Sequence, residues 1–319
     1  MAISKFRLYG ASLAQLKTLC EELGLPRFAH KQIAKWLYSR FVSDIDSMTD
    51  LSKVAREILK EHCELGLSAP LKESVSQDGT KKYLFRTSRG EYIESALIPD
   101  GERMTLCVSS QAGCKMGCKF CATGRMGFRH HLTATEIINQ ILSIPERDKL
   151  TNLVFMGMGE PLDNIDNLLL TLDILTAEWG MAWSPTRITV STAGVARTLP
   201  RLLDESKVHI AVSLHNPFPE ERREIMPIEN SYSIREVCDI LRRYDFTHQR
   251  RVSFEYIVLE GMNSSMRHIK ELSRLLDGIK CRINLIRFHK IPDSPFYSPE
   301  LEKIIEFRDT LTKRGIQTT

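Results

Sequence analysis

The chain has 319 residues, which is too long for one small module and suits a large α/β core with an accessory part. Apolar residues make up 42% and charged residues 26%, a globular composition that excludes a disordered or collagen-like chain. The net charge is +4, and its excess lies in the N-terminal third, where residues 1–90 hold 15 basic and 10 acidic side chains. This asymmetry is a weak indication that the N-terminal part faces nucleic acid.

The first part of the chain, to about Ala69, has apolar residues at helical spacing. Ser12 is a candidate N-cap and Gly24 a stop signal for the first of three predicted helices. The three helices are predicted at Leu13–Leu23, Pro26–Arg40 and Leu51–Cys63. The pattern then changes to strands at Lys81–Arg86, Glu91–Ile98 and Met104–Ser109.

From Met104 onward, strand-like and helix-like segments alternate. Further strands are predicted at Leu153–Met156, Ile188–Ser191, Val208–Leu214, Val252–Leu259 and Arg282–Arg287. Helices are predicted at Ala134–Ile144, Ile165–Ala177, Val195–Leu203, Ile234–Tyr244, Met266–Leu276 and Pro299–Lys313. Six strand–helix units predict a parallel sheet that forms a partial barrel, with ligands at the carboxyl ends of its strands.

The eight cysteines divide into a scattered set and a cluster. Cys114, Cys118 and Cys121 form a C-x3-C-x2-C triplet directly after the first barrel strand. Three thiolates on a cubane cluster leave one iron open, where S-adenosylmethionine can chelate through its amino and carboxylate groups. A zinc site completed by His130 or His131 and a purely structural thiol cluster are the alternatives.

Polar and glycine residues follow several of the other strands. Gly157–Pro161 follows the second strand, where the glycines allow close backbone approach and a carboxylate suits the amino group of a methionine moiety. Taken alone, each such residue is more often a loop or capping residue, but together they surround one end of the sheet.

The chain resembles the RlmN/Cfr family of radical S-adenosylmethionine RNA methyltransferases. The resemblance rests on five segments between about residues 93 and 290: IESALIPDGERMTLCVSSQAGCKMGCKFCATGRMGF, NLVFMGMGEPLDN, ITVSTAGV, AVSLH with IMPIEN, and RINLIRFH. It implies an α/β fold with a radical-SAM partial (β/α)6 barrel and a small helical N-terminal domain. The implied division is a helical RNA-binding domain at 1–70, a β-rich connecting segment at 71–102 and the barrel at 103–319.

The resemblance also implies residue roles. Cys114, Cys118 and Cys121 would hold a [4Fe–4S] cluster, and Glu94 would be the proton acceptor. Cys107 matches a cysteine that pairs transiently with a methyl-carrying cysteine. The residues implied to contact S-adenosylmethionine are Gly159, Glu160, Ser191, Ser213, Leu214, His215 and Asn284.

The implied activity is methylation of carbon 2 of an adenosine in 23S rRNA, and also in tRNA. Carbon 2 is electron-poor and carries no acidic proton, so direct displacement on a sulfonium methyl cannot reach it. The target base must leave its stack to enter the pocket. The implied partners are these RNAs and an electron donor such as flavodoxin. No apolar stretch reaches the ~18–20 residues of a membrane helix, so we expect a cytoplasmic protein, and a monomer.

The sequence departs from the family at its end. The family's methyl-carrying cysteine lies after the last helix, whereas no cysteine follows Cys281 here and Ile316–Thr319 resembles the start of another strand. Either the sequence ends early, which the fit of all upstream segments favours, or the methyl-transfer route is lost. The alternative functions are a cluster-containing RNA-binding protein without methyl transfer, and a radical enzyme acting on a different substrate.

Overall fold

The computed structural model describes residues 5–248 and 250–319, and its main feature is one mixed sheet. Ten strands of the described residues lie in the order β14-β13-β12-β11-β10-β9-β6-β5-β4-β3. Their bounds are β3 Lys72–Val75, β4 Lys81–Arg86, β5 Tyr92–Asp100, β6 Arg103–Cys107, β9 Asn152–Phe155, β10 Ile188–Thr192, β11 His209–Ser213, β12 Val252–Val258, β13 Cys281–Arg287 and β14 Gln317–Thr318. Strand β6 and all strands from β9 to β14 are parallel, whereas β3, β4 and β5 pair in antiparallel fashion.

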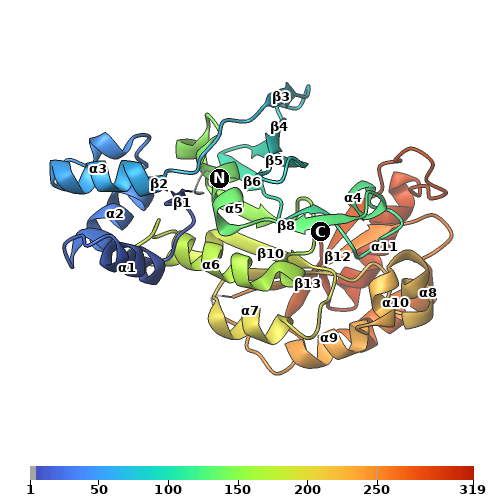
Figure 1. Cartoon of the computed structure of the whole chain (residues 1–319). Helices are drawn as coiled ribbons and strands as arrows, with labels where there is room; N and C mark the ends of the chain where they lie inside the picture. Colours follow the sequence, from blue (N-terminus) through green and yellow to red (C-terminus); the bar gives the residue numbers. More distant parts are fainter. Residues whose placement is uncertain (1–4, 249) are drawn as a thin grey trace.

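Helices connect the parallel strands, as the alternating pattern predicts. They are α5 Ala134–Leu142, α6 Ile165–Thr176, α7 Leu199–Glu205, α8 Pro219–Ile225, α9 Ile234–Leu241, α10 Met266–Leu275 and α11 Leu301–Lys313. Figure 1 shows α6, α7, α9 and α10 in a row along one side of the molecule. Every residue of β12 is buried, which is typical of a parallel strand at the centre of an α/β fold. The fold class predicted from the sequence, a partial barrel of strand–helix units, is confirmed.

The N-terminal helices form a group beside the barrel (Figure 1). They are α1 Leu13–Glu22, α2 Ala29–Tyr38 and α3 Lys53–His62, and the short strands β1 Phe6–Arg7 and β2 Cys63–Glu64 pair in parallel at their base. Ser12 caps α1 in a capping box with Gln15, as its sequence position suggests. The Thr135 hydroxyl donates to the Tyr9 carbonyl at 2.8 Å, and Tyr38 packs edge-to-face on Trp179. The helical part therefore packs directly against the barrel.

The structure adds elements that the pattern did not predict. A hairpin of β7 Gln111–Gly113 and β8 Phe128–His131 encloses the cysteine triplet, which therefore does not follow β6 directly. The short helices α4 Ala122–Arg125 and α8, and the strand β3, are also new, and α7 begins at Leu199 rather than Val195. The strand expected to begin near Ile316 is present as β14. The antiparallel strands over 71–102 extend the barrel's sheet, and the division into three parts stays a prediction.

Candidate active site at the carboxyl ends of the strands

A cavity of about 240 Å³ lies at the carboxyl ends of the parallel strands. The triplet cysteines line it together with most of the residues that the sequence singled out. The predicted residues in its lining are Cys114, Cys118, Cys121, Gly159, Glu160, Ser191, Ser213 and His215. They come from the cysteine loop, the loop after β9 and the ends of β10 and β11, so the fold brings together residues that are spread over 102 positions of the sequence. Among the described residues, no helix is long and apolar enough to cross a membrane.

The cysteine loop is shaped by the hairpin that encloses it. Gly113 has φ +71°, and a Cβ there would lie 1.9 Å from the Gly127 carbonyl oxygen, so only glycine permits this close approach of the two strands. The Cys121 N–H donates to the Cys118 carbonyl at 3.1 Å, which turns the loop back on itself. Burial raises the pKa of Cys114 to about 11, so this thiol keeps its proton at neutral pH until a metal displaces it.

The three thiols surround one cavity, as the ligands of a polynuclear cluster whose irons each take one thiolate would. Within residues 5–248 and 250–319, no group of three or more His, Cys, Asp or Glu side chains could hold a metal ion. His131 is in contact with Gln111 at 3.1 Å, and neither His130 nor His131 lines the cavity, so the structure gives no support to a zinc site that uses them.

Glu160 presents a buried carboxylate that is held by main-chain donors. Its two oxygens accept the N–H groups of Leu162 at 3.1 Å and Ala193 at 2.7 Å. Burial nevertheless raises the pKa of the Glu160 carboxyl to about 7. The cavity lining contains no Lys or Arg side chain, so the Glu160 carboxylate has no cation beside it there. It therefore suits a ligand that carries an ammonium group. The site therefore fits the methionine part of S-adenosylmethionine.

His215 is fixed in one tautomer at the end of β11. Its Nδ1 accepts the Ile257 N–H at 3.0 Å, so a neutral ring carries its proton on Nε2. Burial lowers the pKa of His215 to about 3, which keeps the ring neutral. Its φ of 57° is left-handed, and its ring lies edge-on to Phe120 of the cysteine loop with ring centroids 4.8 Å apart. The histidine therefore offers a hydrogen-bond donor beside the cysteine loop.

The strand register places further predicted residues on one face of the sheet. Residues that pair across neighbouring strands share a face, as do residues two apart along one strand. Glu94 and Ala96 share a face of β5, and Ala96 pairs with Cys107 of β6. The same face continues through the partners Cys107–Val154–Thr189, then Ser191–Ala211, and finally Ser213–Glu255–Asn284. Glu94, Cys107 and Asn284 therefore share the sheet face of the cavity's serines.

Four predicted residues do not line the cavity itself: Leu214, Asn284, Glu94 and Cys107. Leu214 is fully buried and takes part through its main chain, whose N–H donates to the Glu255 carbonyl at 3.0 Å. Asn284 lies behind Glu255, which does line the cavity, and its side-chain amide donates to the Glu255 carboxylate at 2.9 Å. The Glu94 side chain is 53% exposed and lies 3.6 Å from the Lys82 ammonium. Its main chain is nevertheless tied to the site, because the Ser109 hydroxyl donates to the Glu94 carbonyl at 2.5 Å.

Two residues of the site escaped the sequence reasoning. Glu255 lines the cavity from the middle of β12, and burial raises the pKa of its carboxyl. Its position inside an apolar strand was the available signal, because a carboxylate there is rarely structural. Arg222 is fully buried beneath the strand ends, within a run of charged residues that resembles an exposed helix face.

Arg222 connects the loops that carry the site. Its guanidinium donates to the main-chain carbonyls of Ala193 at 2.7 Å, Ser213 at 2.9 Å and Leu214 at 3.0 Å. It also forms an ion pair with the buried Glu229 at 2.5 Å. One side chain thus fixes the ends of β10 and β11 relative to each other.

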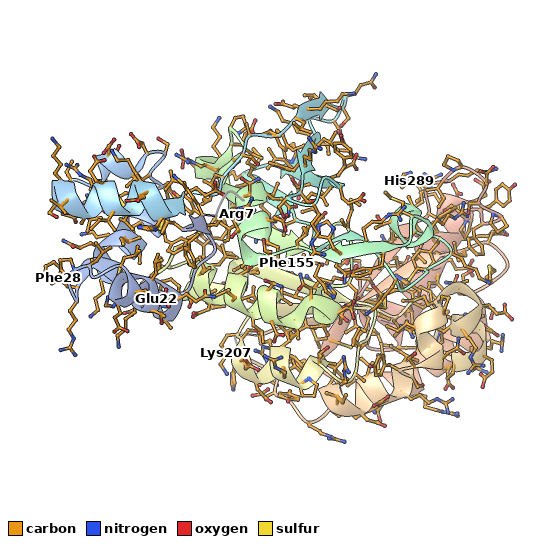
Figure 2. All side chains as sticks on the ribbon, in the orientation of Figure 1. Arg7, Glu22, Phe28, Phe155, Lys207 and His289 are labelled. Carbon is orange, nitrogen blue, oxygen red and sulfur yellow. The ribbon has the colours of Figure 1, made fainter. Side chains whose placement is uncertain are left out.

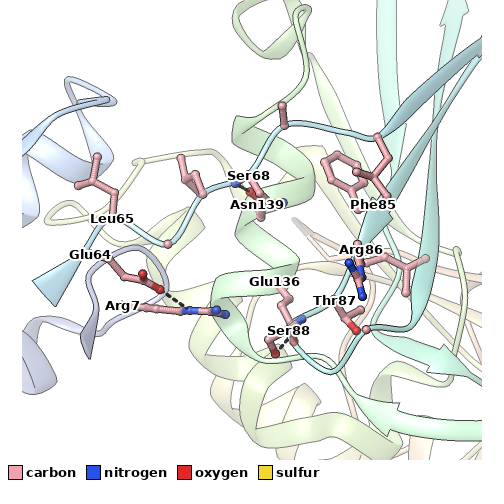
Figure 3. Close-up of a pocket in the computed structure, with 16 residues that line it drawn as sticks. Arg7, Glu64, Leu65, Ser68, Phe85, Arg86, Thr87, Ser88, Glu136 and Asn139 are labelled. Atoms are coloured by element: carbon pink, nitrogen blue, oxygen red, sulfur yellow. Dashed lines mark hydrogen bonds and ion pairs between the residues drawn. The ribbon is translucent and has the colours of Figure 1, made fainter. Parts of the chain in front are cut away.

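A larger cavity of about 620 Å³ lies elsewhere, between the helical part, α5 and the β4–β5 hairpin (Figure 3). None of the predicted site residues lines it. Arg7 pairs with Glu64 at 2.9 Å and the Glu136 carboxylate accepts from Ser88, whereas Arg86 has no ion-pair or hydrogen-bond partner among the described residues (Figure 3). The residues predicted for the chemistry lie around the smaller cavity.

Comparison with known proteins places this geometry in context. The family model for the radical SAM superfamily matches residues 108–274, and the model for the ribosomal RNA large subunit methyltransferase N-terminal domain matches residues 6–65. A "Probable dual-specificity RNA methyltransferase RlmN" from Phocaeicola vulgatus is 54% identical over 319 residues, which are all of this chain and 91% of the relative.

Two further relatives agree with these matches. The "Dual-specificity RNA methyltransferase RlmN" of Syntrophus aciditrophicus is 38% identical over 317 residues, covering 98% of this chain and 91% of the relative. The crystal structure of a radical SAM methyltransferase from Sphaerobacter thermophilus superposes with a TM-score of 0.91 at 40% identity, covering 98% of this chain and 94% of that one.

Proposed function

Because the chain belongs to the RlmN family of radical SAM RNA methyltransferases, we propose that it methylates carbon 2 of an adenosine in 23S rRNA and in tRNA. The observation that carries the proposal is the meeting of the three cysteines with Glu160, Ser191, Ser213 and His215 around one cavity. These are the groups that a cluster and a bound S-adenosylmethionine require. A cytoplasmic location and a monomeric state belong to the same proposal.

Each side chain of the site has a role in the proposal. Cys114, Cys118 and Cys121 hold the [4Fe–4S] cluster, and Glu160 accepts the ammonium group of S-adenosylmethionine. When bound, the cluster supplies the electron that cleaves S-adenosylmethionine to a 5′-deoxyadenosyl radical. The carboxylate of Glu255 accepts hydrogen bonds from the hydroxyl groups of the ligand.

Glu94 accepts the proton that leaves carbon 2 of the adenine. Its support is the shared sheet face with Cys107 and the exposure of its carboxylate, which an incoming base can reach. The Ser109 hydroxyl supports this position, because it joins the Glu94 carbonyl to the Met158 N–H of the glycine-rich loop. Strand β5 is thereby held next to the loop that carries Glu160.

The helical N-terminal part supplies RNA affinity in this proposal. Arg27, Lys31, Lys35 and Arg40 are exposed along and beside α2, with the exposed Phe28 at its start (Figure 2). Phosphate contacts release counterions, so affinity that rests on these side chains decreases steeply with salt. Replacing Lys31 and Lys35 by Glu should lower RNA affinity and the salt slope while leaving iron content unchanged.

The test of the function is product analysis on RNA that lacks the modification. The protein is loaded anaerobically with iron and sulfide, given dithionite and S-adenosylmethionine, and assayed by mass spectrometry for 5′-deoxyadenosine and 2-methyladenosine. The protein is compared with its Cys118→Ala variant, which lacks one of the proposed cluster ligands, and with its Glu94→Ala variant, which lacks the proposed proton acceptor.

We expect both products from the unchanged protein, neither product from Cys118→Ala, and 5′-deoxyadenosine without 2-methyladenosine from Glu94→Ala. Release of 5′-deoxyadenosine with RNA binding but without methylated product by the unchanged protein would favour a cluster-containing RNA-binding protein. A preparation that retains one zinc ion and no iron would refute the radical chemistry altogether.

A further inference from the structure

The strands β3, β4 and β5 carry one face of the sheet out beyond the parallel strands. The even-numbered residues of these three strands are exposed or half-buried. The odd-numbered residues in the middle of β4 and β5 are buried, namely Tyr83, Phe85, Ile93, Ser95 and Leu97. The exposed side is the one on which Ala96 pairs with Cys107, so it is the same sheet face that carries the serines of the reaction cavity. Figure 1 shows the three strands together at one edge of the molecule, and the cavity's sheet face therefore continues outward as a surface open to solvent.

The strand register orders the side chains of this surface in rows. Glu94 lies in one row with Leu84 of β4 and Lys72 of β3. Tyr92 lies in the next row, opposite Arg86. Because β5 runs antiparallel to β6, the step from Glu94 back to Tyr92 leads towards the carboxyl ends of the parallel strands, where the cavity lies. We call Tyr92, Glu94, Leu84 and Lys72 the β3–β5 platform.

Tyr92 presents an aromatic ring that packs on no other ring. The side chain is 53% exposed, and within the described residues it makes no ring–ring or cation–ring contact. Two positions along one strand separate Tyr92 from Glu94 by roughly 7 Å. Stacked nucleotides of one strand are only ~3.4 Å apart, so this gap fits two neighbouring nucleotides whose stack has been opened.

Removal of the target base from its stack leaves the neighbouring base with one uncovered face. The proposed reaction requires this displacement, because the adenine must reach Glu94 and the cavity. An aromatic side chain can cover the exposed base, and such stacking tolerates different sequences because every base has a π face. This tolerance suits a protein that is proposed to act on two kinds of RNA. Lys82 is paired with Glu94 at 3.6 Å, whereas the exposed Lys72 has no ion-pair partner among the described residues and can contact a phosphate.

We propose that the β3–β5 platform binds the single-stranded RNA beside the target adenosine, with Tyr92 stacked on the base of one neighbouring nucleotide and Lys72 on the backbone. The inference rests on the proposed function, in which the target adenine approaches Glu94. Tyr92 contributes binding and positioning rather than chemistry. Its loss therefore weakens RNA binding but leaves the iron content and the RNA-independent release of 5′-deoxyadenosine unchanged.

The first test measures the affinity of the cluster-loaded protein for an RNA hairpin that carries the target adenosine in its loop. Tyr92→Leu removes the ring and keeps apolar bulk, whereas Tyr92→Phe keeps the ring. The matched control is Ile98→Ala, because Ile98 is 42% exposed on the same face of β5 but lies towards the amino ends of the parallel strands. We expect Tyr92→Leu to bind about tenfold more weakly, as loss of one base–aromatic stack implies. Tyr92→Phe and Ile98→Ala should bind within twofold of the unchanged protein.

The salt dependence of the same affinity separates the two contacts. Loss of one phosphate contact lowers the slope of log K against log[salt] by ~0.7 for a single strand. Lys72→Gln should therefore bind with a flatter slope, whereas Tyr92→Leu should lower the affinity and keep the slope of the unchanged protein. Equal slopes for Lys72→Gln and the unchanged protein would refute the backbone contact.

The second test locates the contact in the RNA. 5-Iodouridine replaces each of the two nucleotides that flank the target adenosine in turn, and irradiation joins it to an aromatic ring stacked on it. We expect mass spectrometry to find a cross-link to Tyr92 from one of the two positions, and none in Tyr92→Leu. Unchanged RNA affinity of Tyr92→Leu, or no cross-link to Tyr92 from either position, would overturn the inference and leave the platform to a protein partner. Failure of the unchanged protein to retain iron or to bind the hairpin would instead refute the proposed function on which the inference rests.

Discussion

Replacing Arg222 by Met removes one side chain that holds three parts of the site together. The guanidinium is fully buried, pairs with Glu229, and donates to the carbonyls of Ala193, Ser213 and Leu214. Breaking a buried ion pair by removing one partner costs about 3–5 kcal/mol, because the remaining charge stays buried without compensation. We therefore expect Arg222→Met to lower the free energy of unfolding by about 4 kcal/mol.

A second substitution separates the charge effect from the lost carbonyl contacts. Glu229→Gln alone should destabilise the protein, since it leaves the Arg222 charge unpaired. In the Arg222→Met background the same change should cost less than in the parent, because the carboxylate has already lost its cation and keeps only its hydrogen bonds from the Ser233 hydroxyl and the Ile234 N–H. This difference between the two backgrounds is the specific signature of the pair.

The assay is urea denaturation followed by circular dichroism, with the affinity for S-adenosylmethionine measured in parallel. Arg201→Met is the matched control, because its guanidinium is 45% exposed and its pairs with Glu205 and Asp166 lie on the surface. That control should cost less than about 1 kcal/mol. A loss below about 1 kcal/mol for Arg222→Met, or a Glu229→Gln effect of the same size in both backgrounds, would refute the reasoning.

Three further predictions concern individual residues of the site. Cys118→Ala should reduce the iron content measured after anaerobic loading well below the ~4 atoms per chain of one cluster. Cys238→Ala, at a buried thiol that does not line the cavity, should leave the iron content unchanged. Burial lowers the pKa of His215 to about 3. Below pH 6.5 this histidine therefore binds a proton in the unfolded state but not in the folded state. The free energy of unfolding, measured by urea titration, should therefore fall as the pH drops from 6.5 towards 3. The variant His215→Asn should show a smaller fall. Asn keeps a hydrogen-bond acceptor at this position and tolerates the φ of 57°. Gly159→Ala should lower the free energy of unfolding by roughly 1–3 kcal/mol in the same assay, because φ is +100° and the new Cβ would lie 2.4 Å from a neighbouring side chain. The control Gly261→Ala, with φ +72° and open space around the new Cβ, should lower it less.

The sequence predicts those parts of the site that form short local patterns. The cysteine spacing and the glycine-rich loop after β9 are visible because the residues that act together are neighbours in the chain. The alternating strands and helices likewise follow from local periodicity, so the parallel sheet was predicted strand by strand. β3 was missed because all four of its residues are exposed and show no alternation of burial.

The contacts that escaped prediction are those made over long sequence distances. Arg222 lies in a charged run on α8, and only the packed structure reveals that its partners are carbonyls at the ends of two strands. Glu255 stands in an apolar strand, where its neighbour Asn284 is set by register rather than by sequence. The enclosing hairpin depends on a close approach of Gly113 to Gly127, which no periodicity signals.

The common sheet face of Glu94, Cys107 and Asn284 has a consequence for how this protein can vary. A strand inverts every side chain when its register moves by one position, so one residue inserted before Glu94 within β5 would turn that carboxylate to the opposite side of the sheet. The loops between strands have no such constraint, since an added residue there leaves the pairing intact. Functional relatives of this chain should therefore differ in length in the loops between strands and not inside the strands that carry this face. In those strands, the parity of the residue count is as much a part of the active site as the side chains themselves.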